Sequence, residues 1–180
     1  MQSVTRMAGQ TRGETLSAAV AGDEAAFARI VADYDDEMYR VCVAVCRDHT
    51  VAADAVQSAW TIAWKKLASV RDAASVRPWL VTVAVNEARK LLKKRGQRSE
   101  VEHLGDIPDQ YATADPATGV AMIDLLAALE RLEPDDRALL ALRYMAGFNA
   151  TEIATALNAR PDAVRQRLKR LVDRLREELR

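Results

Sequence analysis

The sequence predicts an all-α protein of two small helical domains joined by a flexible linker, with a helix-turn-helix closing the second domain. Of the 180 residues, 49% are hydrophobic and only 5% aromatic, which is typical of an Ala- and Leu-rich globular chain. Apolar residues recur at three- and four-residue steps in both halves, and no alternating strand pattern appears. Between the halves, residues 96–119 combine Gly, Pro, Asp, Ser and Thr without an apolar period.

Residues 1–22 are predicted to be a flexible N-terminal tail, because they lack apolar periodicity apart from a short stretch near Leu16 to Val20. The N-terminus has no apolar core of a secretory signal. Nothing in the chain reaches the run of ~18 apolar residues that a membrane span needs. We therefore expect a cytoplasmic protein without membrane insertion.

Residues 23–95 are expected to form the first domain from three helices. Asp23 can cap the first helix, whose apolar stripe covers residues 27–45. Asp48-His49-Thr50 breaks that pattern, and a second amphipathic stretch follows over residues 52–67.

A polar loop over residues 69–75 leads to the third helix, which opens at Val76-Arg77-Pro78 and ends at Gly96. Polar and basic side chains crowd the outer face of this helix. They are Asn86, Arg89, Lys90, Lys93, Lys94 and Arg95. Cations in a last helical turn suit the helix dipole, and a cluster this dense also suits phosphate groups.

Cys42, Cys46 and His49 could share one side of the first helix and its end. A metal or redox-sensing site is one interpretation, and small residues packed in a core are the other. A structural zinc site needs four ligands, and no fourth is evident nearby. No metal or other cofactor is therefore predicted.

Residues 120–180 are expected to form the second domain. Apolar residues from Met122 to Leu132 predict one helix. Glu133-Pro134-Asp135-Asp136 starts another, with Pro at its first position and acids in its first turn, and Gly147 stops it.

A helix-turn-helix follows from Asn149 to Arg180. Asn149 and Glu152 have the spacing of a capping box. Asn158 tolerates the left-handed conformation of a tight turn, and Pro161 suits the first turn of a new helix.

The last helix carries an excess of basic side chains in its first half. From Arg160 to Arg170 there are five basic residues and one acid, Asp162. Off the apolar stripe lie long donors that could bond base edges and phosphates in a major groove. They are Arg160, Arg165, Gln166, Lys169 and Arg170. A solvated helix face is the alternative interpretation.

The formal net charge is zero, with 26 basic and 26 acidic residues. Because phosphate neutralisation dominates DNA affinity, a weak overall field argues against tight binding by the chain alone. The sequence indicates a protein that contacts DNA with a partner's help.

These features together resemble the extracytoplasmic-function (ECF) sigma factors, small bacterial initiation subunits of RNA polymerase in the sigma-70 family. LEPDDRALLALRYMAGFNATEIATALNARPDAVRQRLKR is similar to the family's fourth conserved region. YDDEMYRVCVAVCRD, ADAVQSAW and RPWLVTVAVNEARKLLKKR are similar to the second. The resemblance covers residues 23–180, with region 2 over 23–95, an acidic linker over 96–119 and region 4 over 120–180.

The resemblance implies a role for each group of candidate residues. Core polymerase would be bound through Asp54 and Gln57. The minus-ten element would be read and melted through Arg71, Ser75, Arg77, Asn86, Arg89 and Lys90, with a flipped base received near residues 71–75. The minus-thirty-five element would be read through Arg160, Arg165, Gln166, Lys169 and Arg170.

The implied partners are core RNA polymerase, promoter DNA and an anti-sigma factor, without a small-molecule substrate. Ser58, Val76, Val81 and Thr82 depart from residues frequent in the family, and Gln166 replaces a common Ser. The two domains are expected to be mobile relative to each other until they bind the polymerase.

Two other classes of function compete with this interpretation. A stand-alone helix-turn-helix regulator would bind duplex DNA without polymerase, but the neutral charge and the first domain count against it. An enzyme is disfavoured because no acid–base pair, nucleophile or phosphate-binding loop appears. Trp60, Trp64 and Trp79 are expected to pack rather than to stack on bases, and Arg137 and Arg143 could pair with acids.

Overall fold

The computed structural model describes residues 12–98, 127–129 and 131–179, and these residues form helices without any strand. The prediction of an all-α fold is therefore confirmed. The elements in chain order are a helix over residues 12–20, α2 (Glu24–Cys46), α3 (His49–Lys66), η1 (Leu67–Ser69), η2 (Ala73–Ser75), α4 (Val76–Arg98), α6 (Pro134–Leu140), η3 (Ala141–Met145), α7 (Ala150–Leu157) and α8 (Pro161–Glu178). None of the described helices is both long enough and apolar enough to cross a membrane.

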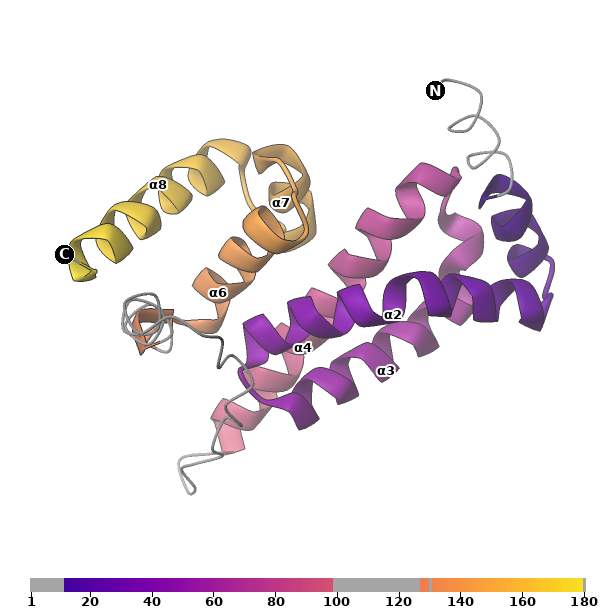
Figure 1. The fold of residues 1–180 in the computed structure, drawn as a ribbon, viewed down its shortest axis with the longest axis horizontal. Helices are drawn as coiled ribbons and strands as arrows, with labels where there is room; N and C mark the ends of the chain where they lie inside the picture. The colour runs from indigo at the N-terminus through magenta and orange to yellow at the C-terminus, as the bar shows by residue number, and fades with distance from the viewer. Residues whose placement is uncertain (1–11, 99–126, 130, 180) are drawn as a thin grey trace, which may run out of the picture.

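The N-terminal block is a bundle of α2, α3 and α4, each packed against the other two (Figure 1). Asp23 caps α2 by accepting a bond of 3.0 Å from the Ala26 N–H, and Asp48 caps α3 in the same way from Val51. The break between the helices is shorter than expected, since α3 begins at His49 directly after its cap. The face of α3 that is buried is mostly Ala, which allows the larger side chains of α2 and α4 to pack closely against it.

The prediction of a flexible tail over residues 1–22 is wrong for its second half. Residues 12–20 form a helix, and Leu16 and Ala19 on that helix are buried in the core. Gly22, at φ 94°, makes the turn into α2. Two buried positions are too few to produce a periodic apolar signal, so the sequence does not predict this helix. Residues 1–11 lie outside the described residues.

Two further boundaries differ from expectation. The third helix does not end at Gly96, because α4 continues through it to Arg98. Gly lowers helix stability by only about 1 kcal/mol, so one Gly does not have to end a helix of 23 residues. Most of the predicted linker over 96–119, and of the helix expected from Met122 to Leu132, falls outside the described residues.

The C-terminal block consists of α6, η3, α7 and α8. Pro134 opens α6 as expected, and Gly147, at φ 73°, ends η3. The sequence predicted one regular helix here, whereas η3 is a π-helix in which the Ala146 N–H bonds the Ala141 carbonyl at 3.0 Å. Figure 1 shows α8 as the outermost helix, packed on α6 and α7.

The helix-turn-helix forms as the sequence predicts. Asn149 accepts bonds from the N–H groups of Thr151 and Glu152, and the Glu152 carboxylate accepts one of 2.7 Å from the Asn149 N–H. This is the predicted capping box. Asn158 adopts the left-handed conformation at φ 52°, and Pro161 is in the first turn of α8.

The two blocks pack against each other. α6 and η3 contact α2, and α6 and α7 contact α4 (Figure 1). Buried apolar residues of both blocks belong to one continuous cluster. The linker's composition favours two mobile domains, but the small C-terminal block has apolar surface to cover, and here α2 and α4 cover part of it.

Candidate nucleic-acid interface

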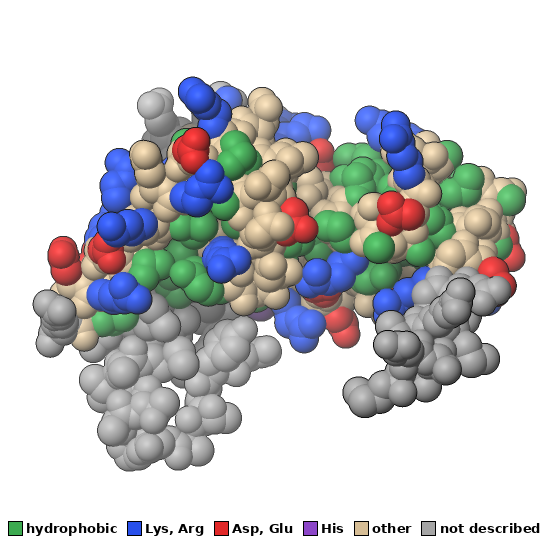
Figure 2. All heavy atoms as spheres, turned by 90° about the horizontal axis from the view of Figure 1, so that it is seen from above, with side chains coloured by type: hydrophobic (Ala, Val, Ile, Leu, Met, Phe, Trp, Pro, Cys, Tyr) green, Lys and Arg blue, Asp and Glu red, His purple; other side chains and the backbone are tan. Residues whose placement is uncertain are grey.

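The outer face of α8 presents the donors that the sequence predicts for duplex DNA. Val164, Leu171 and Leu175 are buried against the rest of the C-terminal block. All five candidate donors are exposed: Arg160, Arg165, Gln166, Lys169 and Arg170. Figure 2 shows Lys and Arg side chains gathered over the end of the molecule that contains α8. The helix therefore buries its apolar stripe and turns its donors outward.

Few of these donors are held by other groups of the chain. Arg165 pairs with Asp162 one turn away, and the Arg170 Nε donates to the Gln166 carbonyl at a long 3.4 Å. The side chains of Arg160 and Lys169 have no bond to any residue that the structure describes. Because exposed ion pairs contribute little, these side chains can exchange their present partners for phosphate or base atoms.

Arg167 differs from its neighbours on α8. Its Nε donates to Asp136 in the first turn of α6 at 2.5 Å, where the Asp136 side chain is only 15% exposed. This ion pair holds α8 on α6. Arg167 is therefore engaged in a contact between α8 and α6.

On α4, Arg77 is held between the two blocks. Its guanidinium donates to both carboxylate oxygens of Glu37 on α2, at 3.0 and 2.5 Å. It also donates to the Ala146 carbonyl at the end of η3, at 2.9 Å. The sequence did not single out Glu37, whose partner is 40 residues away.

Asn86 and Arg89 are also held by the C-terminal block. The Asn86 amide donates to the Ala156 carbonyl in α7 at 3.0 Å. Arg89 donates to Asp135 in α6 at 2.8 Å, and this bond holds the pKa of the Asp135 carboxyl below its ordinary value. Thus three of the six side chains predicted for the minus-ten element contact the C-terminal block.

The other three candidates lie away from this contact. Arg71 is exposed without a bond to the described residues, and Lys90 makes only a long 3.4 Å pair with Glu87. Ser75 donates to Asp72 through both its N–H and its hydroxyl, at 2.8 and 3.0 Å. These bonds fix η2 and hence the predicted base-receiving loop.

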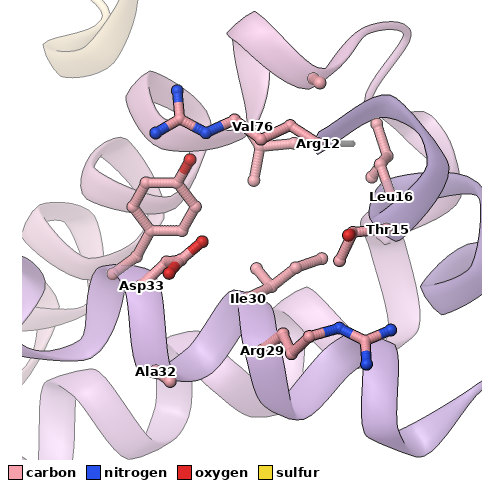
Figure 3. A pocket seen from close by; sticks show the side chains of 10 residues that line it. Arg12, Thr15, Leu16, Arg29, Ile30, Ala32, Asp33 and Val76 are labelled. Atoms are coloured by element: carbon pink, nitrogen blue, oxygen red, sulfur yellow. The ribbon is translucent and has the colours of Figure 1, made fainter. Parts of the chain in front are cut away.

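A pocket of about 260 Å³ opens beside that loop. Figure 3 shows side chains from three elements around it: the helix over residues 12–20, α2 and the start of α4. Its lining includes the apolar Leu16, Ile30 and Val76 and the polar Arg12, Arg29, Asp33 and Tyr34. Ala73 of η2 also lines it, whereas Arg71 and Ser75 do not. The helix over residues 12–20, which the sequence does not predict, therefore forms one wall of a pocket beside the predicted base-receiving loop.

Asp54 and Gln57 lie on the outer face of α3. Both side chains are exposed, and their spacing of three residues places them on one side of the helix. No other described side chain bonds theirs; the Thr61 hydroxyl contacts only the Gln57 carbonyl, at 3.1 Å. The pair is open to a partner.

The two cysteines do not form a site of their own. Burial raises the pKa of both Cys42 and Cys46 to about 12, so both thiols stay protonated at neutral pH. The His49 Nδ1 bonds the Tyr39 hydroxyl at 2.9 Å. Among the described residues no group of three His, Cys, Asp or Glu could hold a metal ion. Of the two interpretations, the geometry favours packing.

The tryptophan rings contact other side chains of the chain, whereas Arg137 and Arg143 bond backbone carbonyls. Phe27 stacks edge-on against Trp60 and Trp64, with ring centroids 5.8 and 4.9 Å apart, and the Trp60 Nε1 donates to Asp35 at 2.7 Å. Trp79 is half-buried and packs against the core. Arg137 donates to carbonyls rather than to acids, bonding Val45 of α2 at 2.7 Å and Leu132. Arg143 donates to the Phe148 carbonyl at 3.1 Å.

Comparison with protein families gives two matches. The family described as "Sigma-70 region 2" matches residues 30–98, and the family described as "Sigma-70, region 4" matches residues 122–175.

Two curated relatives resemble most of the chain. The chain is 32% identical to "Probable RNA polymerase sigma factor RfaY" of Xanthomonas campestris pv. campestris over 169 residues, which is 89% of this chain and 42% of that protein. It therefore spans less than half the length of that relative. It is 29% identical to "ECF RNA polymerase sigma factor SigM" of Mycobacterium tuberculosis, over 92% of this chain and 83% of that one.

Two solved structures share the fold. The sigma factor RpoE from Bartonella quintana, in complex with the anti-sigma factor NepR, matches with a TM-score of 0.67 and 26% identity, covering 85% of this chain and 96% of that one. CnrH in complex with the cytosolic domain of CnrY matches with a TM-score of 0.65 and 21% identity, covering 92% and 94%.

Proposed function

The chain belongs to the sigma-70 family of RNA polymerase sigma factors, within its extracytoplasmic-function group, and on this premise we propose how its two domains act at a promoter. The region 2 domain, over 23–95, docks on core polymerase and opens the minus-ten element. The region 4 domain, over 120–180, reads the minus-thirty-five element. The linker over 96–119 connects them along the polymerase.

The observation that carries this proposal is the outer face of α8. A helix that begins at Pro161, is buried along one stripe and carries exposed donors on its outer face fits a major groove. Gln166 can bond an adenine through two hydrogen bonds, and Arg165 or Arg170 can bond guanine or phosphate. Reading of the minus-thirty-five element is assigned to these side chains, with Arg160 and Lys169 on the phosphates.

Strand opening is assigned to α4 and the loop before it. Opening requires a pocket for an extruded base and cations that grip the displaced strand. The pocket beside η2 supplies the first, with Tyr34 available for stacking and Asp33 for hydrogen bonding. Arg71, Arg77, Arg89 and Lys90 supply the second.

Polymerase docking is assigned to Asp54 and Gln57, which are exposed on α3. The formal net charge of zero implies weak binding to DNA by the chain alone. Once both domains sit on the polymerase, their two modest DNA contacts gain from high effective concentration. Specific promoter binding is then a property of the holoenzyme.

The remaining assignments concern a regulatory protein partner and the cellular compartment. RpoE of Bartonella quintana was solved with an anti-sigma factor, and by analogy we assign this chain a protein partner of that kind. Its work is binding rather than catalysis. Its place of action is the cytoplasm, where polymerase and promoter meet.

The test is binding to purified bacterial core RNA polymerase. The unaltered chain should form a nanomolar-range complex. The double variant Asp54→Ala/Gln57→Ala should bind roughly tenfold more weakly, since a polar interface side chain typically contributes about 1 kcal/mol or more. A matched control is Asp36→Ala/Arg40→Ala, two exposed charged positions on the neighbouring α2.

Absence of a polymerase complex, together with tight duplex binding by the chain alone, would replace this proposal with a stand-alone regulator. Equal weakening by both double variants would remove the assignment of Asp54 and Gln57 and leave the function standing.

A further inference from the structure

One wall of the pocket beside η2 lies outside the part of the chain that matches a family. The region 2 match covers residues 30–98, whereas Arg12, Leu16 and Arg29 of the pocket precede it. Figure 3 shows these side chains on two elements, the helix over residues 12–20 and α2, around one opening. Part of what this pocket can bind is therefore set by residues that the family match does not include.

The pocket combines an apolar interior with charged groups at its opening. Leu16, Ile30 and Val76 line it and are only 8, 5 and 3% exposed, whereas Arg12 and Asp33 are exposed. Its volume of about 260 Å³ lies below the roughly 300–1,000 Å³ of sites for drug-sized ligands. A flat ring of the size of one nucleobase, with its polar edge towards the opening, fits such a cavity.

Opposite charges meet at this opening without pairing. Arg29 and Asp33 are four residues apart on α2, a spacing at which ion pairs commonly form. Neither of these side chains, nor that of Arg12 or Tyr34, bonds any residue within the described part of the chain. A ligand can therefore take up these groups without displacing an internal partner.

The Asp33 carboxylate discriminates between bases. In its ionised state it only accepts hydrogen bonds, so it needs a donor on the edge of the base. Cytosine, adenine and guanine each carry an exocyclic amino group, whereas thymine carries a keto oxygen where cytosine has its amino group. A keto oxygen facing the carboxylate gives no hydrogen bond and adds repulsion between two acceptors. The site therefore favours an amino-bearing base over thymine.

We propose that this pocket selects one unpaired, amino-bearing base of the minus-ten strand, with Asp33 accepting from the amino group and Arg12 and Arg29 on the neighbouring phosphates. The inference rests on the proposed function and adds the class of base that the site selects. Guanidinium groups suit the phosphates because they form charge-assisted, often paired hydrogen bonds with them. Since Arg12 belongs to the helix over residues 12–20, that helix is part of the promoter-reading surface.

The test is selection of DNA by the holoenzyme. Core polymerase carrying the chain is mixed with a fork-shaped DNA library whose single-stranded minus-ten segment is randomised, and sequencing gives the base frequencies at each position. The unaltered chain should deplete thymine at one position. Asp33→Asn should raise the frequency of thymine there about tenfold, because the amide can donate to a keto oxygen, and should leave the other positions unchanged.

Two matched controls accompany the variants. Asp36→Asn is the same change at an exposed position of α2 that does not line the pocket, and it should select like the unaltered chain. Arg12→Ala should lower the slope of log affinity against log salt by about 0.7 without changing the preferred base, since one phosphate contact to a single strand is lost. Arg40→Ala, an exposed cation of α2 away from the pocket, should leave that slope unchanged.

The outcomes separate this inference from the proposed function. Thymine accepted at every position, or depleted equally in Asp33→Asn, overturns the base assignment, and so does an equal change in Asp36→Asn. A salt slope that Arg12→Ala leaves unchanged overturns the role of the helix over residues 12–20. In each of these cases the holoenzyme still selects a minus-ten sequence, so the sigma function stands. A holoenzyme that selects no sequence at all overturns the proposed function and the base assignment with it.

Discussion

At the scale of single residues, α8 carries two kinds of donor that should behave differently on DNA. Gln166 can recognise a base edge, and Lys169 is a point charge suited to phosphate. We expect Gln166→Ala to weaken holoenzyme binding to the preferred promoter by about 1–3 kcal/mol and to relax selectivity at one base pair. Binding to a set of upstream elements that differ at single positions measures both effects.

Lys169→Ala is the comparison for that experiment. Both positions are exposed on the same helix. This variant should weaken all sequences alike and lower the slope of log affinity against log salt by about 1. A uniform loss for Gln166→Ala as well would mean that neither side chain reads a base.

Asn149 is the residue that fixes the start of the helix-turn-helix. Its side chain satisfies two backbone N–H groups of α7 that would otherwise lack partners. Asn149→Ala should lower the free energy of unfolding by about 1 kcal/mol, read from the midpoint of urea denaturation. Thr151→Ala, an exposed change in the same turn, should leave the midpoint nearly unchanged. An equal shift in both variants would contradict a capping effect.

At the scale of elements, the helix over residues 12–20 is held by two buried side chains. Leu16 is 8% exposed, whereas Val20 on the same helix is 44% exposed. Leu16→Ala should lower the free energy of unfolding by about 2 kcal/mol, at the lower end for a buried Leu because the site is near the surface. Val20→Ala should cost less than about 0.5 kcal/mol. Thermal unfolding of both variants checks the difference, and equal costs would mean that the helix does not pack on the bundle.

Some elements were predictable because their signals are local. Asn149 with Glu152, the left-handed Asn158 and Pro161 act within four residues of chain, so the sequence alone located the helix-turn-helix. Asp23 as a cap was predictable for the same reason. The π-helix η3 was not, since nothing within its five residues differs from an ordinary helical turn.

Contacts between distant segments were not predictable in the same way. Arg77 bonds Ala146 across 69 residues, and Asn86 bonds Ala156 across 70. Their partners are backbone carbonyls, which every residue has, so no side-chain pattern in the sequence predicts these contacts. The sequence therefore identified α4 as a basic, polar face but not what covers it.

At the scale of the whole molecule, the charge balance and the packing of the two blocks both favour weak binding of nucleic acid by the chain alone. Equal numbers of basic and acidic residues give a weak overall field, and the contact between the blocks occupies part of the candidate DNA surface. Both effects lower the affinity of the chain alone for nucleic acid. Under the proposed function, promoter specificity would therefore depend on the complex with polymerase.

Asp135 makes the contact between the blocks sensitive to acid. The hydrogen bond from Arg89 lowers the pKa of Asp135, helped by the charges of Arg89, Arg167 and Lys93, while partial burial opposes it. The conformation in which the two blocks are packed together therefore favours the ionised state of Asp135. Asp135 therefore stabilises the contact between the blocks fully at a pH above its ordinary pKa of 3.8. This stabilisation is lost as the pH falls through the lower pKa that Asp135 has when the blocks are packed together.

The fraction of chains in which the two blocks have separated, the open fraction, should accordingly rise as the pH falls below about 4, measured as the distance between one spin label on each block. Asp48 also has a lowered pKa, because it caps α3 through Val51 and pairs with Arg95. Its protonation weakens the N-terminal block itself rather than the contact between the blocks. Asp135→Asn should therefore start with a higher open fraction near neutral pH and change little on acidification, while circular dichroism confirms that the helices persist. An acid-induced opening of the same size in Asp135→Asn would show that another carboxyl group controls the contact.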